Sequence, residues 1–377
     1  MRVIVAPDSL KGSIGARAAA AALAEGWHAA RPGDHLVRLP LADGGEGTLE
    51  VLAWADPAAR WHVAEVTGPD GRRVASRWLQ LGDGTGYVEL AQASGLPLMR
   101  APDPLGAQTT GTGELCARAV DAGAPRIMIG LGGSAATDGG TGALATLGAR
   151  FLDGAGRELR PGGGALRDLA SVDLTGLRPP PAGGVTCLTD VRAPLLGPGG
   201  AAAVFGPQKG ASPEQVAILE AGLARLAQVL GGGPSAEGAG AAGGAGYGFA
   251  AAWGADITPG AAELCRIAGL DQELARADLV LTAEGRYDAT SAQGKITETL
   301  LGAAARAGVP AALVAGTVAA EPPPGVTVVT LAELAGGTAA AMASPERWLR
   351  AAGEVLAGRL GMPAATARGA SGDRLGR

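Results

Sequence analysis

The sequence is poor in three residue types that often carry catalysis or binding, histidine, cysteine and lysine, with three of each among 377 residues. The histidines lie away from every motif described below, which argues against a histidine general base. The cysteines fit neither a disulfide framework nor a zinc-ligand spacing, so we expect small buried side chains. These cysteines are Cys116, Cys187 and Cys265.

Two further absences exclude classes of protein. Lys and Arg total 31 against 36 Asp and Glu, so the chain has no large basic surface for nucleic acid. Charges or glycines interrupt every apolar run before the roughly 18 residues that a membrane span needs, and Pro7 and Asp8 stop the N-terminal run. We therefore expect a cytoplasmic protein with neither nucleic acid nor membrane as its partner. A monomer or homodimer is expected, although composition does not decide between them.

Each of the three lysines has a glycine beside it, in Lys11-Gly12, Lys209-Gly210 and Gly294-Lys295. A genome that favours arginine codons would leave a few lysines by chance. The alternative is chemical, because a compact ammonium can approach a phosphate where a guanidinium does not fit, and glycine lets the backbone come close. The sequence leaves both explanations open.

What is abundant is glycine, with 64 residues that follow no fixed period and are separated by apolar runs. This pattern is typical of loops over an ordered α/β core. At the N-terminus we expect a strand over 2–6, a helix over 13–30 with Ser13 as its N-cap, and a strand over 36–41. Between about 61 and 96, turn sequences predict antiparallel hairpins and a second, different lobe.

The later chain returns to the α/β alternation. Ser212, Pro213 and Gln215 form a capping box that starts a helix over 211–230. Short buried strands follow at 279–282, 311–315 and 326–330, separated by Ala-rich helical segments, as in a parallel sheet.

One glycine-rich segment has the pattern of a dinucleotide-binding loop. Residues 130–135 satisfy G-x-G-x-x-[GA] after a predicted strand, and we expect a helix over 137–147 to follow. The backbone N–H groups of Gly132 and Gly133, with Ser134, would then face a phosphate at a helix N-terminus, near Thr137 and Asp138. A NAD-dependent hydroxy-acid dehydrogenase is one alternative that this loop leaves open, whereas a P-loop is absent.

Acidic residues follow several predicted strands. In an open α/β sheet this edge is where ligands bind, although a single acidic residue there is more often a cap or a turn residue. Together with the lysines, these carboxylates supply what phosphoryl transfer needs: ligands for Mg²⁺, cations for phosphates and a base. The residues are Asp8, Asp43, Asp190, Glu284 and Asp288.

Several blocks resemble motifs of the type-1 glycerate kinases. They are Ala6-Pro7-Asp8-Ser9-Leu10-Lys11-Gly12-Ser13, Ala42-Asp43-Gly44-Gly45-Glu46-Gly47-Thr48, Gly111-Thr112-Gly113-Glu114, Gly130 to Gly142, Phe205 to Gly210, Gly238 to Gly246 and Glu284-Gly285-Arg286. They occur in the family's order from residue 3 to about 316. The chain departs from the usual pattern at Thr110, Ala193, Ala283 and Thr290.

The resemblance implies two dissimilar α/β domains, one Rossmann-like with a mostly parallel sheet and the second inserted into it, with the active-site cleft between them. We expect the first domain over 1–62 and 275–362, the inserted domain over 63–274, and a flexible tail over 363–377. It further implies ATP and D-glycerate as substrates and a need for Mg²⁺. The 2-hydroxyl is the expected acceptor, and the 3-hydroxyl is the alternative.

We assign roles to the matching residues as hypotheses. Lys11 and Lys295 would neutralise the transferring phosphoryl group, and Asp190 or Asp288 would accept the hydroxyl proton. Asp8 and Asp43 would hold Mg²⁺ or substrate hydroxyls. The remaining substrate candidates are Ser9, Gly44, Gly45 and Glu46, and the phosphate or nucleotide candidates are Gly132, Gly133, Ser134, Thr137, Asp138, Lys209 and Glu284. A non-catalytic sensor of small anions is the other alternative.

Overall fold

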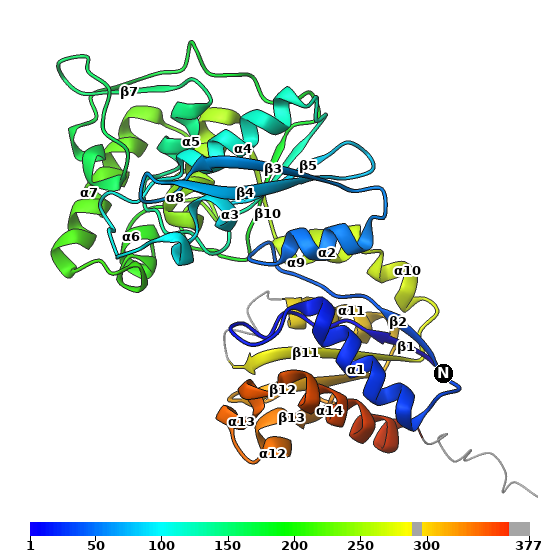
Figure 1. The fold of residues 1–377 in the computed structure, drawn as a ribbon. Helices are drawn as coiled ribbons and strands as arrows, with labels where there is room; N and C mark the ends of the chain where they lie inside the picture. The colour runs from blue at the N-terminus through cyan, green and yellow to red at the C-terminus, as the bar shows by residue number, and fades with distance from the viewer. Residues whose placement is uncertain (289–295, 362–377) are drawn as a thin grey trace, which may run out of the picture.

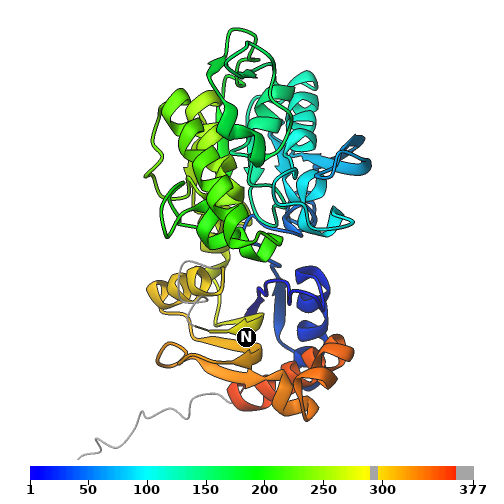
Figure 2. The same ribbon diagram turned by 90° about the vertical axis from the view of Figure 1, so that its left-hand side faces the viewer.

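The computed structural model of the protein describes residues 1–288 and 296–361, whose strands form two main sheets in two lobes (Figures 1 and 2). Lys295, Thr290 and the predicted tail over 363–377 lie outside the described residues. The strands of one sheet come from both ends of the chain, and those of the other come from its middle. The prediction of two dissimilar α/β domains, one inserted into the other, is therefore confirmed.

The small lobe is built on a five-stranded sheet in the order β13-β12-β11-β1-β2, with every neighbouring pair parallel. Its strands are β1 (Arg2–Val5), β2 (His35–Arg38), β11 (Leu279–Tyr287), β12 (Ala311–Val318) and β13 (Thr327–Thr330). Its helices are α1 (Ala16–Ala30), α9 (Gly260–Ile267), α10 (Leu270–Leu274), α11 (Ile296–Ala307), α12 (Leu331–Ala335), α13 (Thr338–Ala343) and α14 (Pro345–Leu360).

Alternation along β1 explains how this sheet is covered on both faces. Val3 and Val5 pack with α1 and α14, whereas Ile4 points to the opposite face and packs with α9 and α11. The helices α1 and α14 approach closely at Gly26, which has no side chain. A Cβ there would lie 1.9 Å from the carbonyl oxygen of Arg350. A doubly covered parallel sheet results.

The large lobe is built on a six-stranded sheet in the order β10-β9-β6-β5-β4-β3. Its strands, with the separate β7–β8 hairpin, are β3 (Arg60–Thr67), β4 (Arg73–Gln80), β5 (Gly86–Glu89), β6 (Ile127–Gly130), β7 (Arg150–Leu152), β8 (Ser171–Asp173), β9 (Val185–Leu188) and β10 (Asp256–Thr258). Its helices are α2 (Thr48–Ala55), α3 (Ala91–Ser94), α4 (Thr110–Asp121), α5 (Thr141–Thr146), α6 (Ala201–Phe205), α7 (Pro213–Leu230) and α8 (Ala241–Trp253), with 3₁₀ turns at Leu96–Leu98, Gly163–Asp168 and Pro207–Lys209.

The predicted hairpins are present as the antiparallel pairs β3–β4 and β4–β5, whereas β5, β6, β9 and β10 are parallel. The capping box at Ser212 and Gln215 starts α7 as predicted. The predicted start of the first helix is wrong, because α1 begins at Ala16 with Gly15 as its N-cap. Ser13 instead lies in a tight turn that a bridge between Leu10 and Ile14 closes.

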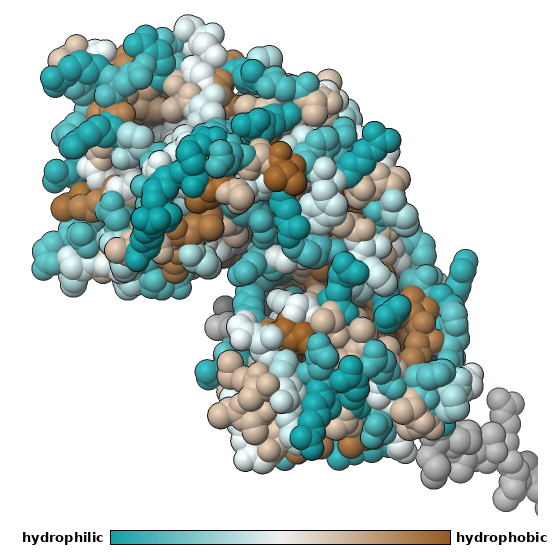
Figure 3. All heavy atoms as spheres, viewed as in Figure 1, coloured by the Kyte–Doolittle hydropathy of each residue, from teal (hydrophilic) through white to brown (hydrophobic). Residues whose placement is uncertain are grey.

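Three helices near the predicted domain limits pack at the junction of the two lobes. The helix α2, predicted in the first domain, packs with Leu49 and Leu52 against Leu79 and Tyr87 of the large lobe. The helices α9 and α10, predicted in the inserted domain, pack against the small sheet beside Ile4. These segments carry the chain between the lobes and lie along one side of the molecule (Figure 1), whereas the surface is notched between the lobes on the other side (Figure 3).

Candidate active site

The first acidic residue of the site, Asp8, lies just beyond the carboxyl end of β1. The N–H group of Asp8 donates to the carbonyl oxygen of Ala283 at 2.9 Å, which fixes this residue beside β11. The Asp8 carboxylate accepts a hydrogen bond from the N–H group of Ser9 at 2.6 Å. Burial and then the charge of Asp43 raise the pKa of Asp8 to about 7. This carboxyl group therefore stays partly protonated near neutral pH.

Lys11 and Asp43 stand beside Asp8. The Lys11 Nζ lies 3.7 Å from Asp43 Oδ2, and the charge of Asp43 raises the pKa of this lysine. Asp8, Lys11, Asp43 and Glu284 line one cavity of about 420 Å³, which we call the Lys11 cavity. The structure thus brings together residues that lie far apart in the chain.

Asp288 also borders the Lys11 cavity. Its carboxylate lies 3.2 Å from the guanidinium group of Arg286. Glu46 lines a neighbouring cavity of about 570 Å³, the Trp54 cavity, which shares Asp8 and Ser9 with the Lys11 cavity. Among residues 1–288 and 296–361, no group of three or more His, Cys, Asp or Glu side chains is arranged to hold a metal ion.

Glycines hold Asp43 at the junction of the lobes through backbone contacts. A Cβ at Gly132 would lie 2.4 Å from Gly45 Cα, and a Cβ at Gly130 would lie 2.4 Å from the carbonyl oxygen of Gly44. The segment 43–45 therefore rests directly on the glycine-rich loop after β6. Only glycine permits this approach, because the obstructing atoms belong to the backbone.

Asp190 follows β9 and approaches the same junction from the large lobe. Its carboxylate oxygens each accept from the N–H group of Ala261 at 3.3 Å, in the first turn of α9. The pKa of Asp190 is raised to about 7, mainly by burial and partly by the charge of Asp43, while the hydrogen bond from the Ala261 N–H group lowers it. Asp43 is thus electrostatically coupled to an acidic group in each lobe.

The glycine-rich loop after β6 does not open a helix as predicted. The helix α5 begins only at Thr141, after Gly140 in a left-handed conformation. The strand–turn–helix context of a dinucleotide site is therefore missing, which removes the structural basis for the dehydrogenase alternative. Gly132, Gly133 and Ser134 instead line a cavity of about 340 Å³, the Lys209 cavity.

Lys209 is only 4 % exposed at the floor of that cavity. Its Nζ donates to the carbonyl oxygen of Ala136 at 2.5 Å and lies 3.5 Å from Thr137 Oγ1. Burial lowers the pKa of Lys209 to about 8. The structure does not bring this lysine into the same cavity as Lys11.

Thr137 and Asp138, predicted to contact phosphate, are fully buried. The Asp138 carboxylate accepts from the N–H and hydroxyl groups of Thr109 and from the N–H group of Gly140. These bonds join the starts of α4 and α5. The structure corrects the prediction, because both residues hold the loop from inside instead of facing a ligand.

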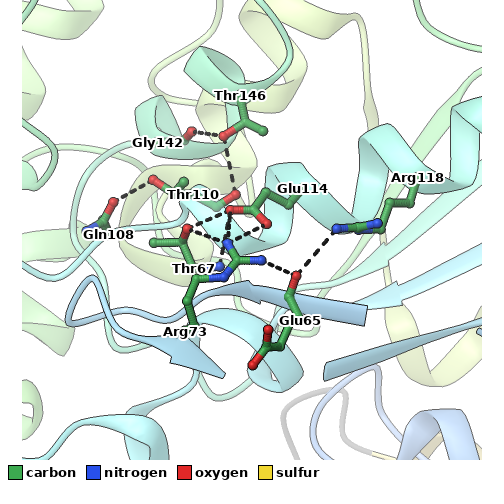
Figure 4. Close-up of polar contacts among 9 residues, drawn as sticks. All are labelled: Glu65, Thr67, Arg73, Gln108, Thr110, Glu114, Arg118, Gly142 and Thr146. Atoms are coloured by element: carbon green, nitrogen blue, oxygen red, sulfur yellow. Dashed lines mark hydrogen bonds and ion pairs between the residues drawn. The ribbon is translucent and has the colours of Figure 1, made fainter. Parts of the chain in front are cut away.

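The Gly111–Glu114 block also has a structural role (Figure 4). The Glu114 carboxylate accepts from the N–H and hydroxyl groups of Thr67 at 3.1 and 2.6 Å and pairs with Arg73 at 3.1 Å. A Cβ at Gly111 would lie 2.2 Å from the carbonyl oxygen of Thr67. This block fixes α4 against the β3–β4 hairpin.

Glu89 was not among the residues predicted from the sequence. This fully buried carboxylate accepts from the N–H groups of Gly47 and Leu49 at 3.3 and 3.2 Å, and so supports the loop that carries Asp43. Burial raises the pKa of Glu89 to about 7. An acidic residue directly after the apolar pair Tyr87-Val88 was the available signal, the same one that drew attention to Asp8.

Because the pKa of Asp8 is raised, we expect the free energy of unfolding to fall as pH rises from about 5 to 7. In this range the unfolded state, with an ordinary carboxyl pKa of 3.8, has released a proton that the folded state retains, so rising pH favours unfolding. Asp190 and Glu89 act in the same direction. We expect calorimetry to show a melting temperature lower by at least about 2 °C at pH 7 than at pH 5, and a smaller difference in Asp8→Asn. A melting temperature that rises with pH over this range would contradict the assignment.

Comparison with known proteins agrees with this geometry. The profile described as "Glycerate kinase family" matches residues 3–360. The chain belongs to the glycerate kinase family. The family resemblance and the predicted kinase class are therefore confirmed, and membership in a kinase family implies ATP as a substrate. Among the described residues, no helix is both long and apolar enough to cross a membrane.

Individual relatives extend over most of the chain. Glycerate kinase of Bacillus subtilis is 42 % identical over 331 residues, which are 84 % of this chain and 85 % of the relative. Glycerate 2-kinase of Escherichia coli is 41 % identical over 305 residues, which are 78 % of this chain and 80 % of the relative. A crystal structure from Salmonella typhimurium LT2, assigned as a glycerate kinase 2, superposes with a TM-score of 0.83 at 38 % identity and covers 96 % of this chain and 98 % of its own.

Proposed function

We propose that this protein transfers the γ-phosphoryl group of ATP to the 2-hydroxyl group of D-glycerate, giving 2-phosphoglycerate and ADP. The main support is the arrangement at the junction of the lobes, where Asp43 lies beside Lys11. The charge of Asp43 also acts on Asp8 and on Asp190. Family membership supports the reaction class, and the E. coli relative named glycerate 2-kinase supports the choice of hydroxyl.

Asp190 is our candidate for the general base. A base works best when its pKa lies near the working pH, and burial raises the pKa of Asp190 to about 7. The carboxylate would take the proton of the 2-hydroxyl group as its oxygen attacks the γ-phosphorus. Asp288 is the less favoured candidate, because its carboxylate already pairs with the Arg286 guanidinium at 3.2 Å.

Lys11 is our candidate for neutralising the transferring phosphoryl group. Its side chain is 73 % exposed, and its ammonium group is free to turn from Asp43 towards a phosphate in the Lys11 cavity. Lys295 keeps the same proposed role, although it lies outside the described residues. Lys209 lies beneath Gly132, Gly133 and Ser134, where it would support an anionic group of either substrate.

Asp8 and Asp43 would hold Mg²⁺. Mg²⁺ is usually bound by one or two carboxylates together with substrate phosphates, so a dedicated cluster of three protein ligands is not required. The donor set fits, because Asp8, Asp43 and Glu284 repel one another in one cavity and a cation would relieve that repulsion. Bound Mg²⁺ would neutralise charge on the phosphate oxygens. Ser9, Gly44, Gly45 and Glu46 would complete the substrate contacts around this pair.

Phosphorus NMR tests this function directly. The purified protein is incubated with ATP, Mg²⁺ and D-glycerate, with a sample lacking glycerate as the control. We expect a 2-phosphoglycerate signal that grows as ATP is consumed. A 3-phosphoglycerate signal would keep the kinase and change the acceptor hydroxyl, whereas unchanged ATP would reject the kinase and favour the anion sensor.

A further inference from the structure

The Lys11 cavity has two chemically different ends. Its charged end lies at the carboxyl ends of β1 and β11, with Asp8, Lys11 and Glu284. Its other end is formed by α12, α13 and the start of α14, where Leu331, Ala341, Met342 and Pro345 contribute apolar atoms. A ligand that fills this cavity therefore needs a charged part and an apolar part.

Glycerate does not match this second end. It is a small molecule in which every carbon carries oxygen, so it offers no apolar surface to Ala341 or Met342. Cavities that bind small molecules and cofactors measure roughly 300–1,000 Å³ and are mostly lined by apolar groups with a few polar ones. A volume of about 420 Å³ is in that range and would stay largely unfilled around glycerate alone.

Resting on the proposed function, we propose that the adenine base of ATP binds against the α12–α14 wall of the Lys11 cavity, in contact with Met342. The triphosphate then runs towards Lys11 and Asp8, and glycerate approaches from the large lobe beside Asp190. This placement puts the nucleotide at the carboxyl edge of a parallel sheet, where ligands of open α/β sheets bind. The Gly132 loop is thereby left to the glycerate side of the cleft.

Met342 is the side chain that we expect to contact the adenine base. It is 53 % exposed although it is apolar, and it stands at the cavity edge next to Ala341, which is 5 % exposed. An unbranched thioether side chain adapts its shape and makes favourable contacts with aromatic rings. The Trp54 cavity is a poorer site for the base, because the guanidinium groups of Arg17 and Arg38 already lie 4.7 and 5.4 Å from the Trp54 ring centre.

The binding of two probes distinguishes contacts with the adenine base from contacts with the phosphates. Calorimetric titrations with the Mg²⁺ complexes of AMP-PNP and of inorganic tripolyphosphate are made on the wild type, on Met342→Ala and on Thr338→Trp. Removing the Met342 contact should raise the Kd of AMP-PNP at least about fivefold and leave that of tripolyphosphate within about twofold. Thr338 is exposed at the same wall, and a bulky indole there should obstruct the base in the same selective way.

Val204→Ala is the matched control, because Val204 is 47 % exposed on α6 in the large lobe, and neither Kd should change. Unchanged AMP-PNP binding in both cavity variants, or equal weakening of both probes, would overturn the proposal while wild-type turnover still supports the kinase. A wild type that neither binds AMP-PNP nor phosphorylates glycerate would reject the proposed function, and this inference with it.

Discussion

Asp190→Asn should lower kcat at least about a hundredfold, because positioned proton transfer contributes roughly 10²–10⁴-fold to catalysis. Asparagine keeps an oxygen that can accept from the Ala261 N–H group, so the contact between the segment after β9 and the start of α9 should survive. It also removes a half-buried charge, which should leave the protein at least as stable. Steady-state kinetics with ATP and D-glycerate, together with thermal unfolding, measure both effects.

Two further variants make the Asp190 result specific. Asp256→Asn, at the exposed first residue of β10, removes one carboxylate outside the junction and should leave kcat unchanged. Asp288→Asn tests the other candidate base. If Asp190→Asn kept more than about a tenth of wild-type turnover while Asp288→Asn lost it, Asp288 would be the base and the assignment made here would be wrong.

Gly132→Ala should lower kcat/KM by about a hundredfold, the scale expected when reacting groups move by roughly 1 Å. The added Cβ would lie 2.4 Å from Gly45 Cα, so the two glycine loops must separate and Asp43 must move with them. Overpacking of this kind also destabilises by about 1–3 kcal/mol. Kinetics and chemical denaturation of the same preparation measure the two consequences.

Gly199→Ala is the control for the Gly132 substitution, because no atom lies within 4 Å of a Cβ at Gly199 and its backbone is not left-handed. It should behave as the wild type. Normal kcat/KM in Gly132→Ala would show that the contact between the loops does not position Asp43. A folded Gly132→Ala protein with lost activity would show that it does.

Local chemistry made parts of this protein predictable from sequence. The start of α7 follows from the capping box of Ser212 and Gln215, since those bonds involve only neighbouring residues. The β3–β4 turn is equally local. Asp8 and Asp43 could be named because acidic residues after strands lie at a known edge of a parallel sheet.

Predictions from the sequence were wrong where contacts between distant segments decide what a residue does. Asp138 looked like a phosphate contact, but its carboxylate is taken up by Thr109, which lies 29 residues earlier. The Gly132 loop looked like the start of a helix, but it packs on Gly45 and only later leads to α5. Glu89 was missed because its partners, Gly47 and Leu49, come from another element.

The sequence by itself determined the family, the α/β alternation and the residue types for phosphoryl transfer, because these depend on motif order and on local periodicity. Only the tertiary structure decided which of those residues meet. It placed Asp43 between Asp8 and Asp190, separated Lys209 from Lys11 and buried Asp138. The physical reason is that backbone contacts between glycines and the packing of two sheets set the distances between side chains, and neither is encoded in any one short segment.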